Sequence, residues 1–331
     1  MKRRAFLALT GAAALGPAPA RAVHAVRGPI DAAALGTTLV HEHVLVDFGG
    51  AEVASRSRYD AEEAFRVALP QLQELRSRGC QTFFECTPAY LGRDPLLLRR
   101  LSEASGLQIV TNTGYYGAAR DIAIPKHAYA ETPKQLAARW TAEFERGIED
   151  SGIRPGFVKL GVDAGPLSPI DRKLVEAGAL THLATGLTLA IHTGDGRAAL
   201  EIMGVLAGLG IAPEAYVWVH AQNEKDPATR AWAAMQGAWV ELDGVSQSSL
   251  ATHVLAVLDL HRRDLLGRVL VSQDAGWYHV GEPGGGRYRP HVFLFDSFVP
   301  ALRAAGLGDA EIRTLLVENP AEAFAIRHRP A

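Results

Sequence analysis

Residues 36–43 read Gly-Thr-Thr-Leu-Val-His-Glu-His, a short apolar run that ends in two histidines separated by one residue. Such a run predicts a strand, and on a strand His41 and His43 point to one face while Glu42 points to the other. The two imidazoles either bind a metal ion together or form a surface pair at the strand end. The longer metal pattern H-x-H-x-D-H is excluded, because residues 44–46 are Val-Leu-Val.

This strand is the first of eight short apolar runs, each followed by a longer amphipathic segment. The predicted strands are 38–44, 81–86, 107–113, 156–160, 187–192, 216–220, 238–242 and 268–272. The predicted helices are 60–78, 94–104, 132–149, 168–184, 196–208, 225–236, 246–262 and 291–304. No Gly-x-Gly-x-x-Gly follows the first strand, so the usual dinucleotide signature is missing. The alternation predicts an α/β fold, a single-domain (β/α)₈ TIM barrel, with both histidines facing the barrel interior.

The composition is ordinary for a globular protein, with 48% hydrophobic and 21% charged residues among 331. A formal net charge of −2 gives no electrostatic footprint for nucleic acid or an anionic membrane, so the expected partner is a small-molecule substrate. Cys80 and Cys86 bracket a predicted strand and would lie about 20 Å apart, beyond disulfide reach. Both are therefore predicted to be reduced.

The first 22 residues differ from the rest of the chain. They begin Met-Lys-Arg-Arg, continue through a short Ala/Leu/Gly run and end in Ala20-Arg21-Ala22. This pattern predicts a twin-arginine-type signal peptide over 1–22, a barrel domain over 23–331 and a periplasmic or secreted location. A frayed amphipathic helix is the alternative. The apolar run is too short for a membrane span, so no stable membrane anchor is expected.

Lys159 lies within the otherwise apolar predicted strand 156–160. Burying an unpaired lysine costs several kcal/mol or depresses the pKa of its amine. Either a carboxylate inside the protein pairs with the ammonium group, or the nitrogen is used in the chemistry of a site. A neutral lysine amine can take up carbon dioxide to form a carbamate, and that anion can bridge two cations.

His192, His220 and Asp274 each stand at the end of a predicted strand. Each alone has an ordinary explanation, either as a satisfied core histidine or as an aspartate that caps the next segment. Together with the residues above, they come from strands one, four, five, six and eight, whose C-terminal ends converge in a barrel. Imidazole and carboxylate ligands suit Zn²⁺, with Mn²⁺, Co²⁺ and Fe²⁺ as alternatives.

This order and spacing resembles the phosphotriesterase family of the amidohydrolase superfamily, from residues 36–43 to Val317-Glu318-Asn319-Pro320. The resemblance implies two divalent metal ions, with a bridging hydroxide that attacks the substrate. It assigns His41, His43 and Asp274 to the more buried ion, His192 and His220 to the more exposed ion, and a carboxylated Lys159 to the bridge between them. Asp274 would also be catalytic, as the proton acceptor. Dimers are usual in that family, so the resemblance implies a homodimer.

Near the predicted site, the sequence departs from the better-known branches of the family. Asn223 stands where phosphotriesterases and lactonases have an aspartate, and Gly244 where they have a histidine or an arginine, so neither residue can relay a proton as a carboxylate can. Glu224 or His253 could replace the relay, although a loop residue without such a role is the simpler explanation for each. Tyr116 stands where lactonases have a tyrosine and triesterases a tryptophan, which favours a carbonyl substrate and predicts that Tyr116 binds it.

The segment 275–288 after Asp274 is rich in glycine and aromatic residues and leaves from the predicted active-site end of the barrel. It is predicted to form a substrate lid or pocket wall, with Trp277 and Arg287 as substrate-binding residues, and a plain surface excursion is the alternative. No Gly-Lys-Ser/Thr follows its three consecutive glycines, which excludes a phosphate loop. Arg287 or Arg289 could recognise an anionic substituent.

The sequence thus predicts a metal-dependent hydrolase of a small ester, with a lactone or carboxylic ester favoured. The first alternative is a phosphotriester or phosphoester hydrolase. An alternative of another class is a catalytically silent periplasmic binding protein. Loss of a ligand would favour the silent protein, but all six ligand positions are present.

Overall fold

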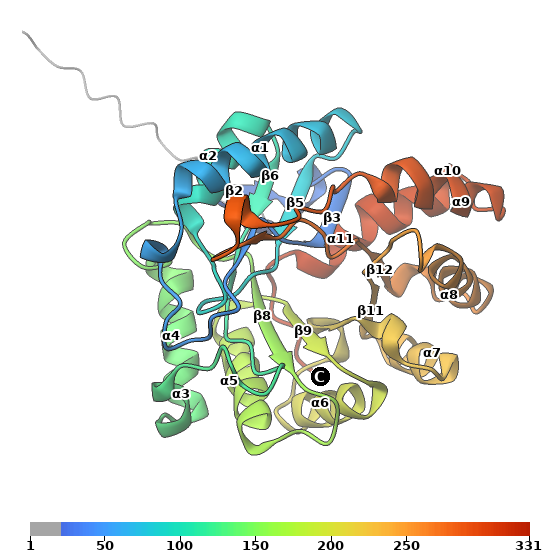
Figure 1. The fold of residues 1–331 in the computed structure, drawn as a ribbon. Coiled ribbons are helices and arrows are strands. Elements are labelled where there is room, and N and C mark those ends of the chain that lie inside the picture. The colour runs from blue at the N-terminus through green and yellow to red at the C-terminus, as the bar shows by residue number, and fades with distance from the viewer. Residues whose placement is uncertain (1–20) are drawn as a thin grey trace, which may run out of the picture.

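Eight parallel strand positions form the centre of the molecule, which the computed structural model describes for residues 21–331 (Figure 1). They are β3 (Thr38–Glu42), β5 (Thr82–Glu85), β6 (Gln108–Val110) continuing as β7 (Asn112–Thr113), β8 (Phe157–Val162), β9 (Leu189–Thr193), β10 (Tyr216–Val219), β11 (Trp239–Leu242) and β12 (Val269–Val271). Neighbouring strands pair in chain order, in one run from β3 to β6 and another from β7 to β12. Thr111 separates the two runs within the third strand position.

The last strand returns to the first and closes the ring. The backbone N–H of Asp274 donates to the carbonyl of His41 at 3.1 Å, and that of His43 donates to the carbonyl of Ala275 at 2.9 Å. The N–H of His41 donates to Ser272 Oγ at 3.0 Å. The predicted (β/α)₈ barrel is therefore confirmed.

Helices surround this ring, and each predicted helix is present with small shifts at its ends (Figure 1). They are α1 (Ala61–Ser77), α2 (Pro95–Ser105), α4 (Pro133–Arg146), α5 (Pro169–Thr185), α6 (Gly196–Gly208), α7 (Pro227–Met235), α8 (Leu250–Arg262) and the π-helical segment η7 (Leu294–Phe298) that continues into α9 (Val299–Ala304). Several begin at polar caps: Asp60, Asp94, Thr132 and Ser168 each accept a hydrogen bond from the first-turn backbone.

Smaller elements complete the chain. They are β1 (Ala22–Ala25), β2 (Gly28–Asp31), β4 (Leu45–Val46), β13 (Tyr278–His279), α3 (Lys126–Ala130), α10 (Asp309–Arg313), the π-helical η8 (Thr314–Glu318) and α11 (Asn319–Phe324). Strand β13 pairs in parallel with β4, so the segment after Asp274 is fastened beside the segment after His43. This pairing places the start of the 275–288 loop at the same end of the barrel as the histidines.

The strands separate two apolar layers, because successive side chains on a strand point to opposite faces. One layer fills the barrel interior and includes Val40, Phe84, Phe157, Ala190, Val217, Trp239 and Leu270, with Val23 and Phe324 packed against them. The other layer lies between strands and helices and includes Leu39, Phe83, Val158, Leu189, Trp218 and Val240. Cys86 belongs to the inner layer and Cys80 to the outer one, and both are free thiols as predicted.

A β-bulge interrupts this alternation in the first strand. Leu39 pairs with Phe83 and Glu42 pairs with Glu85, so β3 holds one more residue than β5 between these pairs. The extra residue lets Val40 and His41 both face the barrel interior, while Glu42 turns outward. Bulges of this kind re-aim a side chain beside an active site.

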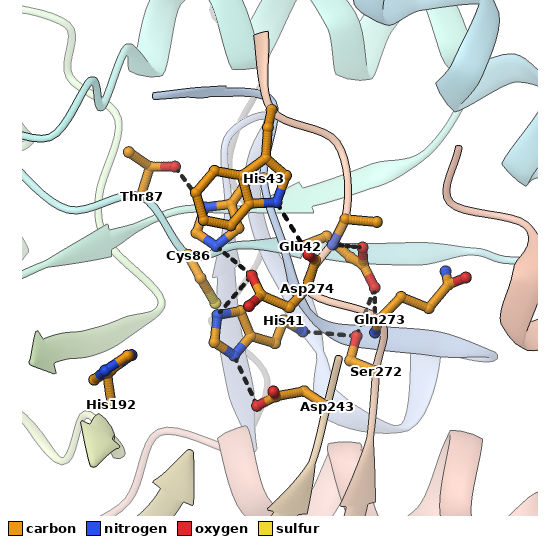
Figure 2. A network of polar contacts seen from close by, with 12 residues as sticks. His41, Glu42, His43, Cys86, Thr87, His192, Asp243, Ser272, Gln273 and Asp274 are labelled. Carbon is orange, nitrogen blue, oxygen red and sulfur yellow. Dashed lines mark hydrogen bonds and ion pairs between the residues drawn. The ribbon is translucent and has the colours of Figure 1, made fainter. Parts of the chain in front are cut away.

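Glu42 fastens the closure of the barrel through both carboxylate oxygens (Figure 2). Its Oε1 accepts hydrogen bonds from Ser272 Oγ at 2.8 Å and from the N–H of Gln273 at 2.9 Å. Its Oε2 accepts from the N–H of Ala275 at 2.9 Å and lies 2.9 Å from His291 Nδ1. Glu42 is fully buried, and so is the His291 ring. One carboxylate thus holds the backbone on both sides of Asp274.

The structure corrects the predicted location. Ala22, the predicted cleavage point, lies in β1 and pairs with Asp31 of β2. The carbonyl of Arg21 accepts from the N–H of Ala32 at 2.7 Å, and its guanidinium pairs with Glu322 at 2.5 Å. Cleavage there would cut into a folded hairpin, and nothing in the described residues indicates export, so the prediction of a periplasmic or secreted protein is wrong.

The remainder of the predicted signal, residues 1–20, lies outside the described residues. Within 21–331, no helix combines the length and the apolar character needed to cross a membrane.

Replacing Glu42 by Gln tests the closure. The amide keeps the shape of the side chain but turns one acceptor into a donor that faces backbone N–H groups, and it leaves His291 without its partner. We expect the free energy of unfolding to fall by about 3 kcal/mol, measured by urea denaturation. Glu62→Gln on the exposed face of α1 is the matched control, with an expected change within about 0.5 kcal/mol. Equal stability of the two variants would contradict a closure that depends on Glu42.

Candidate metal centre

His41, His43 and Asp274 come together at the C-terminal end of the barrel (Figure 2). Asp274 Oδ1 lies 3.0 Å from His43 Nε2 and 3.7 Å from His41 Nε2. The rings of the two histidines lie 5.4 Å apart, centre to centre. The bulge in β3 and the closure by Glu42 produce this convergence, since they aim both histidines and the aspartate at one point.

Asp274 presents a carboxylate oxygen that suits a cation. Its Oδ1 is buried and forms no well-aligned hydrogen bond within residues 21–331, although two imidazole nitrogens face it. Burial alone raises the pKa of Asp274, but the charges of His41 and His43 and the contact with His43 outweigh burial and hold the pKa below its usual range. The carboxylate is therefore ionised. A buried ionised oxygen without a well-aligned proton donor is well suited to bind a cation.

His220 reaches the same point by a different local route. Alternation along β10 would turn it outward, because Val219 before it faces the interior. Instead its backbone is left-handed, with φ of 63°, and the ring turns inward to lie 5.1 Å from the His41 ring. Asp243, which follows β11, accepts from the backbone N–H of His220 and contacts its Nδ1. Gln222 Nε2 donates to the same carboxylate at 2.8 Å.

His192 completes the group of four histidines. It ends β9, and its ring lies 4.4 Å from that of His220. The Tyr116 hydroxyl lies 3.1 Å from His192 Nδ1, so the tyrosine predicted to bind substrate contacts a predicted metal ligand directly. Burial lowers the pKa of His192 well below its usual range, and the charges of His220 and Lys159 lower it further. A neutral imidazole of this kind keeps a lone pair for a metal ion.

Lys159 lies in β8 between Val158 and Leu160, and only 2% of its surface is exposed. Within residues 21–331, it forms no ion pair and no hydrogen bond, so the alternative of a carboxylate partner is not what the structure contains. Its charge is felt by the histidines: burial lowers the pKa of His41 to about 4, and the Lys159 charge is the second cause. The lysine nitrogen thus belongs to the same group of side chains.

Three buried residues contact the Nδ1 atoms of the histidines. The sequence pattern assigned no role to these residues. Glu241 Oε1 lies 2.7 Å from His41 Nδ1, Thr87 Oγ1 lies 2.8 Å from His43 Nδ1, and Asp243 contacts His220 Nδ1. Thr87 in turn donates to Glu85 Oε1 at 2.6 Å. Contacts of this kind orient metal-binding histidines in proteins. Alternation places Glu241 and Asp243 on one face of a strand, and that was the available signal.

The structure also shows the surroundings of Gly244 and of the two candidate relay residues, Glu224 and His253. Gly244 has no side chain, and Gln222 lies beside it: a Cβ at Gly244 would come 3.4 Å from Gln222 Nε2. Glu224 binds a backbone group: its Oε2 accepts a hydrogen bond from the N–H of Gly196 at 2.8 Å. His253 Nε2 lies 2.6 Å from the carbonyl of Asp243 rather than at the carboxylates of the centre. Neither candidate for a substitute proton relay contacts Asp274.

The loop after Asp274 contributes an aromatic wall. The Trp277 ring lies 4.5 Å from that of His43 and stacks at 5.6 Å on Phe48, whose side chain is 49% exposed. Arg289 donates to the carbonyl of Asp274 at 2.9 Å, which supports the backbone of this residue. Arg287 is exposed and forms no ion pair in the part of the chain that the structure describes. Arg289 is thus engaged by the backbone beside Asp274, and Arg287 has no such contact among the described residues.

This (β/α)₈ barrel gathers four histidines, an ionised aspartate and a lysine that has no ion-pair partner within residues 21–331 at the C-terminal ends of its strands. Such a barrel defines a metal-dependent hydrolase. His41, His220 and Asp274 by themselves place donor atoms close enough to hold one metal ion. The sequence model of the Phosphotriesterase family matches residues 21–324, and the chain belongs to that family. Members of the family depend on two metal ions and hydrolyse ester bonds, so the predicted enzyme class is confirmed.

Similar proteins span nearly the whole chain. The phosphotriesterase homology protein of Escherichia coli K12 is 28% identical over 87% of this chain and 98% of its own length. A phospho-furanose lactonase of Mycoplasmopsis synoviae is 25% identical over 91% of this chain and 90% of its own. A solved structure from the engineering of organophosphate hydrolysis activity from a weak promiscuous lactonase template superposes with a TM-score of 0.82, at 26% identity over 92% of this chain and 99% of that one.

The pH dependence of metal affinity tests this centre. Burial lowers the pKa of His220, but its pairing with Asp243 outweighs burial, and the net pKa is raised. A metal ion must displace the extra proton, so affinity should fall by about tenfold for each pH unit below the pKa of His220. We expect this slope in Zn²⁺ affinities measured by chelator competition between about pH 5 and pH 8. In Asp243→Asn, the slope should move to lower pH. An affinity independent of pH would contradict the assignment of His220.

Proposed function

We propose that the protein hydrolyses a lactone or a related carboxylic ester with the help of two divalent metal ions. The observation that carries the proposal is the buried Asp274 oxygen, which faces His41 and His43 without a well-aligned proton donor in the described residues. A silent binding protein would have no reason to maintain an ionised carboxylate in this position, because burying it costs free energy.

In this proposal, the six predicted ligands share two ions. His41, His43 and Asp274 would hold one, His192 and His220 the other, and Lys159 would bridge both as its carbamate. The missing ion-pair partner of Lys159 in the described residues supports this role, because no carboxylate there engages its nitrogen. Zn²⁺ is the metal that a donor set of imidazoles and one carboxylate suits best.

The metal ions, when bound, would lower the pKa of a water molecule so that it can act as the nucleophile near neutral pH. Asp274 would accept the proton of that water, since its carboxylate is ionised and lies at the point where the histidines meet. Among the described residues, neither Glu224 nor His253 contacts Asp274, since Glu224 accepts from Gly196 and His253 lies against the carbonyl of Asp243. The proton would then leave Asp274 directly to solvent.

Tyr116 supports the choice of a carbonyl substrate. Its hydroxyl lies beside His192, and burial raises the pKa of the phenol, so the group remains a hydrogen-bond donor. A donor at this edge of the centre can orient a carbonyl or ring oxygen. Trp277 and Phe48 would cover the apolar part of the substrate on the opposite side, and Arg287 would meet an anionic substituent. The lactonase among the relatives supports the same choice.

Hydrolysis of phosphotriesters is the second candidate. The family to which the chain belongs and the structural neighbour from organophosphate engineering support it. Tyr116 and the lactonase relative favour the carbonyl substrate, and the two candidates differ in a single measurable property, the substrate profile.

The first test compares a panel of lactones with a matched panel of aryl phosphotriesters on the Zn²⁺-loaded protein. We expect kcat/KM to be higher for lactones, and Asp274→Asn to lower it by about 10²–10⁴-fold, because a proton acceptor is lost. Asp226→Asn, at the exposed cap of α7, is the matched control and should remain close to wild type. Circular dichroism checks that both variants are folded.

Faster turnover of phosphotriesters would overturn the carbonyl proposal in favour of the second candidate. No turnover in either panel, with folded and metal-loaded protein, would favour the silent binding protein instead.

Tyr116→Phe tests the substrate choice separately. The variant removes one hydroxyl and keeps the ring that packs against His192. We expect about a tenfold loss of kcat/KM for lactones, the equivalent of one hydrogen bond, and a smaller loss for phosphotriesters. Equal losses in both panels would mean that Tyr116 supports His192 rather than the substrate.

A further inference from the structure

Glu241 is a buried acid inside the barrel, at a position where apolar side chains would be expected. It lies in β11 between Val240 and Leu242, which belong to the outer apolar layer, and only 1% of its surface is exposed. Trp239, two residues earlier on the same face, belongs to the inner layer. Burying a carboxyl group here costs several kcal/mol relative to an apolar residue, so stability alone does not explain its presence.

The polar contacts of Glu241 point to His41. Glu241 Oε1 lies 2.7 Å from His41 Nδ1, and Asp243 Oδ2 lies 3.3 Å from the same nitrogen. The other ring nitrogen, Nε2, faces Asp274 Oδ1. Nδ1 of His41 thus faces two carboxyl groups, whereas Nε2 faces Asp274 of the metal centre.

This arrangement decides where the His41 proton resides. A neutral imidazole carries one N–H and one lone pair. Glu241 Oε1 and Asp243 Oδ2 both face Nδ1, so an N–H on that nitrogen has acceptors, and the lone pair is then left on Nε2, toward Asp274. The contact also fixes the angle of the ring, since a hydrogen bond of this length constrains rotation about the side-chain bonds.

We propose that Glu241 is a positioning residue of the metal centre, which fixes the tautomer and orientation of His41 so that Nε2 can bind the ion. Glu241 acts through His41 and touches neither substrate nor reacting atoms. What His41 needs from this position is an acceptor that reaches Nδ1. The inference rests on the metal centre of the proposed function.

Two substitutions separate the effect of the side-chain length of Glu241 from the effect of its acid group. Glu241→Gln keeps an acceptor oxygen at the same length but removes the acid, whereas Glu241→Asp keeps the acid but withdraws it by one methylene group. We expect the Asp variant to bind Co²⁺ and Zn²⁺ 10–100-fold more weakly at one of the two sites, about the loss typical of such outer contacts. The Gln variant should stay within about threefold of wild type. Chelator competition measures both affinities.

The absorption spectrum of the Co²⁺-loaded proteins provides a readout that loss of stability alone does not move. The Asp variant should change the visible bands, because His41 approaches the ion differently, and the Gln variant should restore the wild-type spectrum. Asp94→Ala is the matched control: it removes a buried carboxylate that caps α2 and contacts Tyr59 and Arg56 instead of a histidine, and it should leave affinity and spectrum unchanged.

The proposal is overturned if the Asp variant binds metal like wild type, or if the Gln variant loses as much affinity as the Asp variant. These results differ from a failure of the proposed function itself, in which wild-type protein would bind no metal ion at the centre. Wild-type binding with unaffected variants would remove only the role of Glu241.

Discussion

The structure depends on one buried carboxylate at the junction of the first and last strands. Glu42 accepts hydrogen bonds from Ser272, Gln273 and Ala275 and pairs with His291, so it satisfies the backbone where a strand ladder has ended. A closed barrel needs such a junction, since an open edge would leave unpaired groups. Because Glu42 stands between the two histidines of the first strand, the interaction that closes the fold also fixes the metal centre.

The centre is built from backbone conformations that regular structure would not supply. Asp274 and His220 both have positive φ, at 50° and 63°, a state that costs non-glycine residues about 1–3 kcal/mol each. Their surroundings maintain it: Arg289 and the Glu42 network hold the backbone around Asp274, and Asp243 holds His220. The strain is therefore part of how the barrel turns strand ends into a convergent set of ligands.

Three residues from other parts of the barrel orient the histidines of the candidate centre. Acceptors at Nδ1 are provided by Glu241, Thr87 and Asp243, so the rings are oriented before any ion arrives. In contrast, neither Glu224 nor His253, the two residues considered as a substitute proton relay, contacts Asp274 within the described residues.

The sequence alone determined the barrel, because eight alternating apolar and amphipathic runs have few other solutions, and it predicted which residues at the strand ends are candidate ligands, because metal binding demands particular side chains there. The tertiary structure decided how they face one another. The extra residue in β3 and the left-handed backbone of His220 break the two-residue period on which a sequence argument relies. The partners of the ligands, Glu241 and Thr87 among them, come from other strands. Alternation places Glu241 and Asp243 on one strand face, but the local sequence does not say which histidine each contacts. The predicted periplasmic or secreted location was wrong for a related reason. Arg21 and Ala22 have the composition of a cleavage site. Only their pairing with Ala32, Asp31 and Glu322 shows that they belong to the fold.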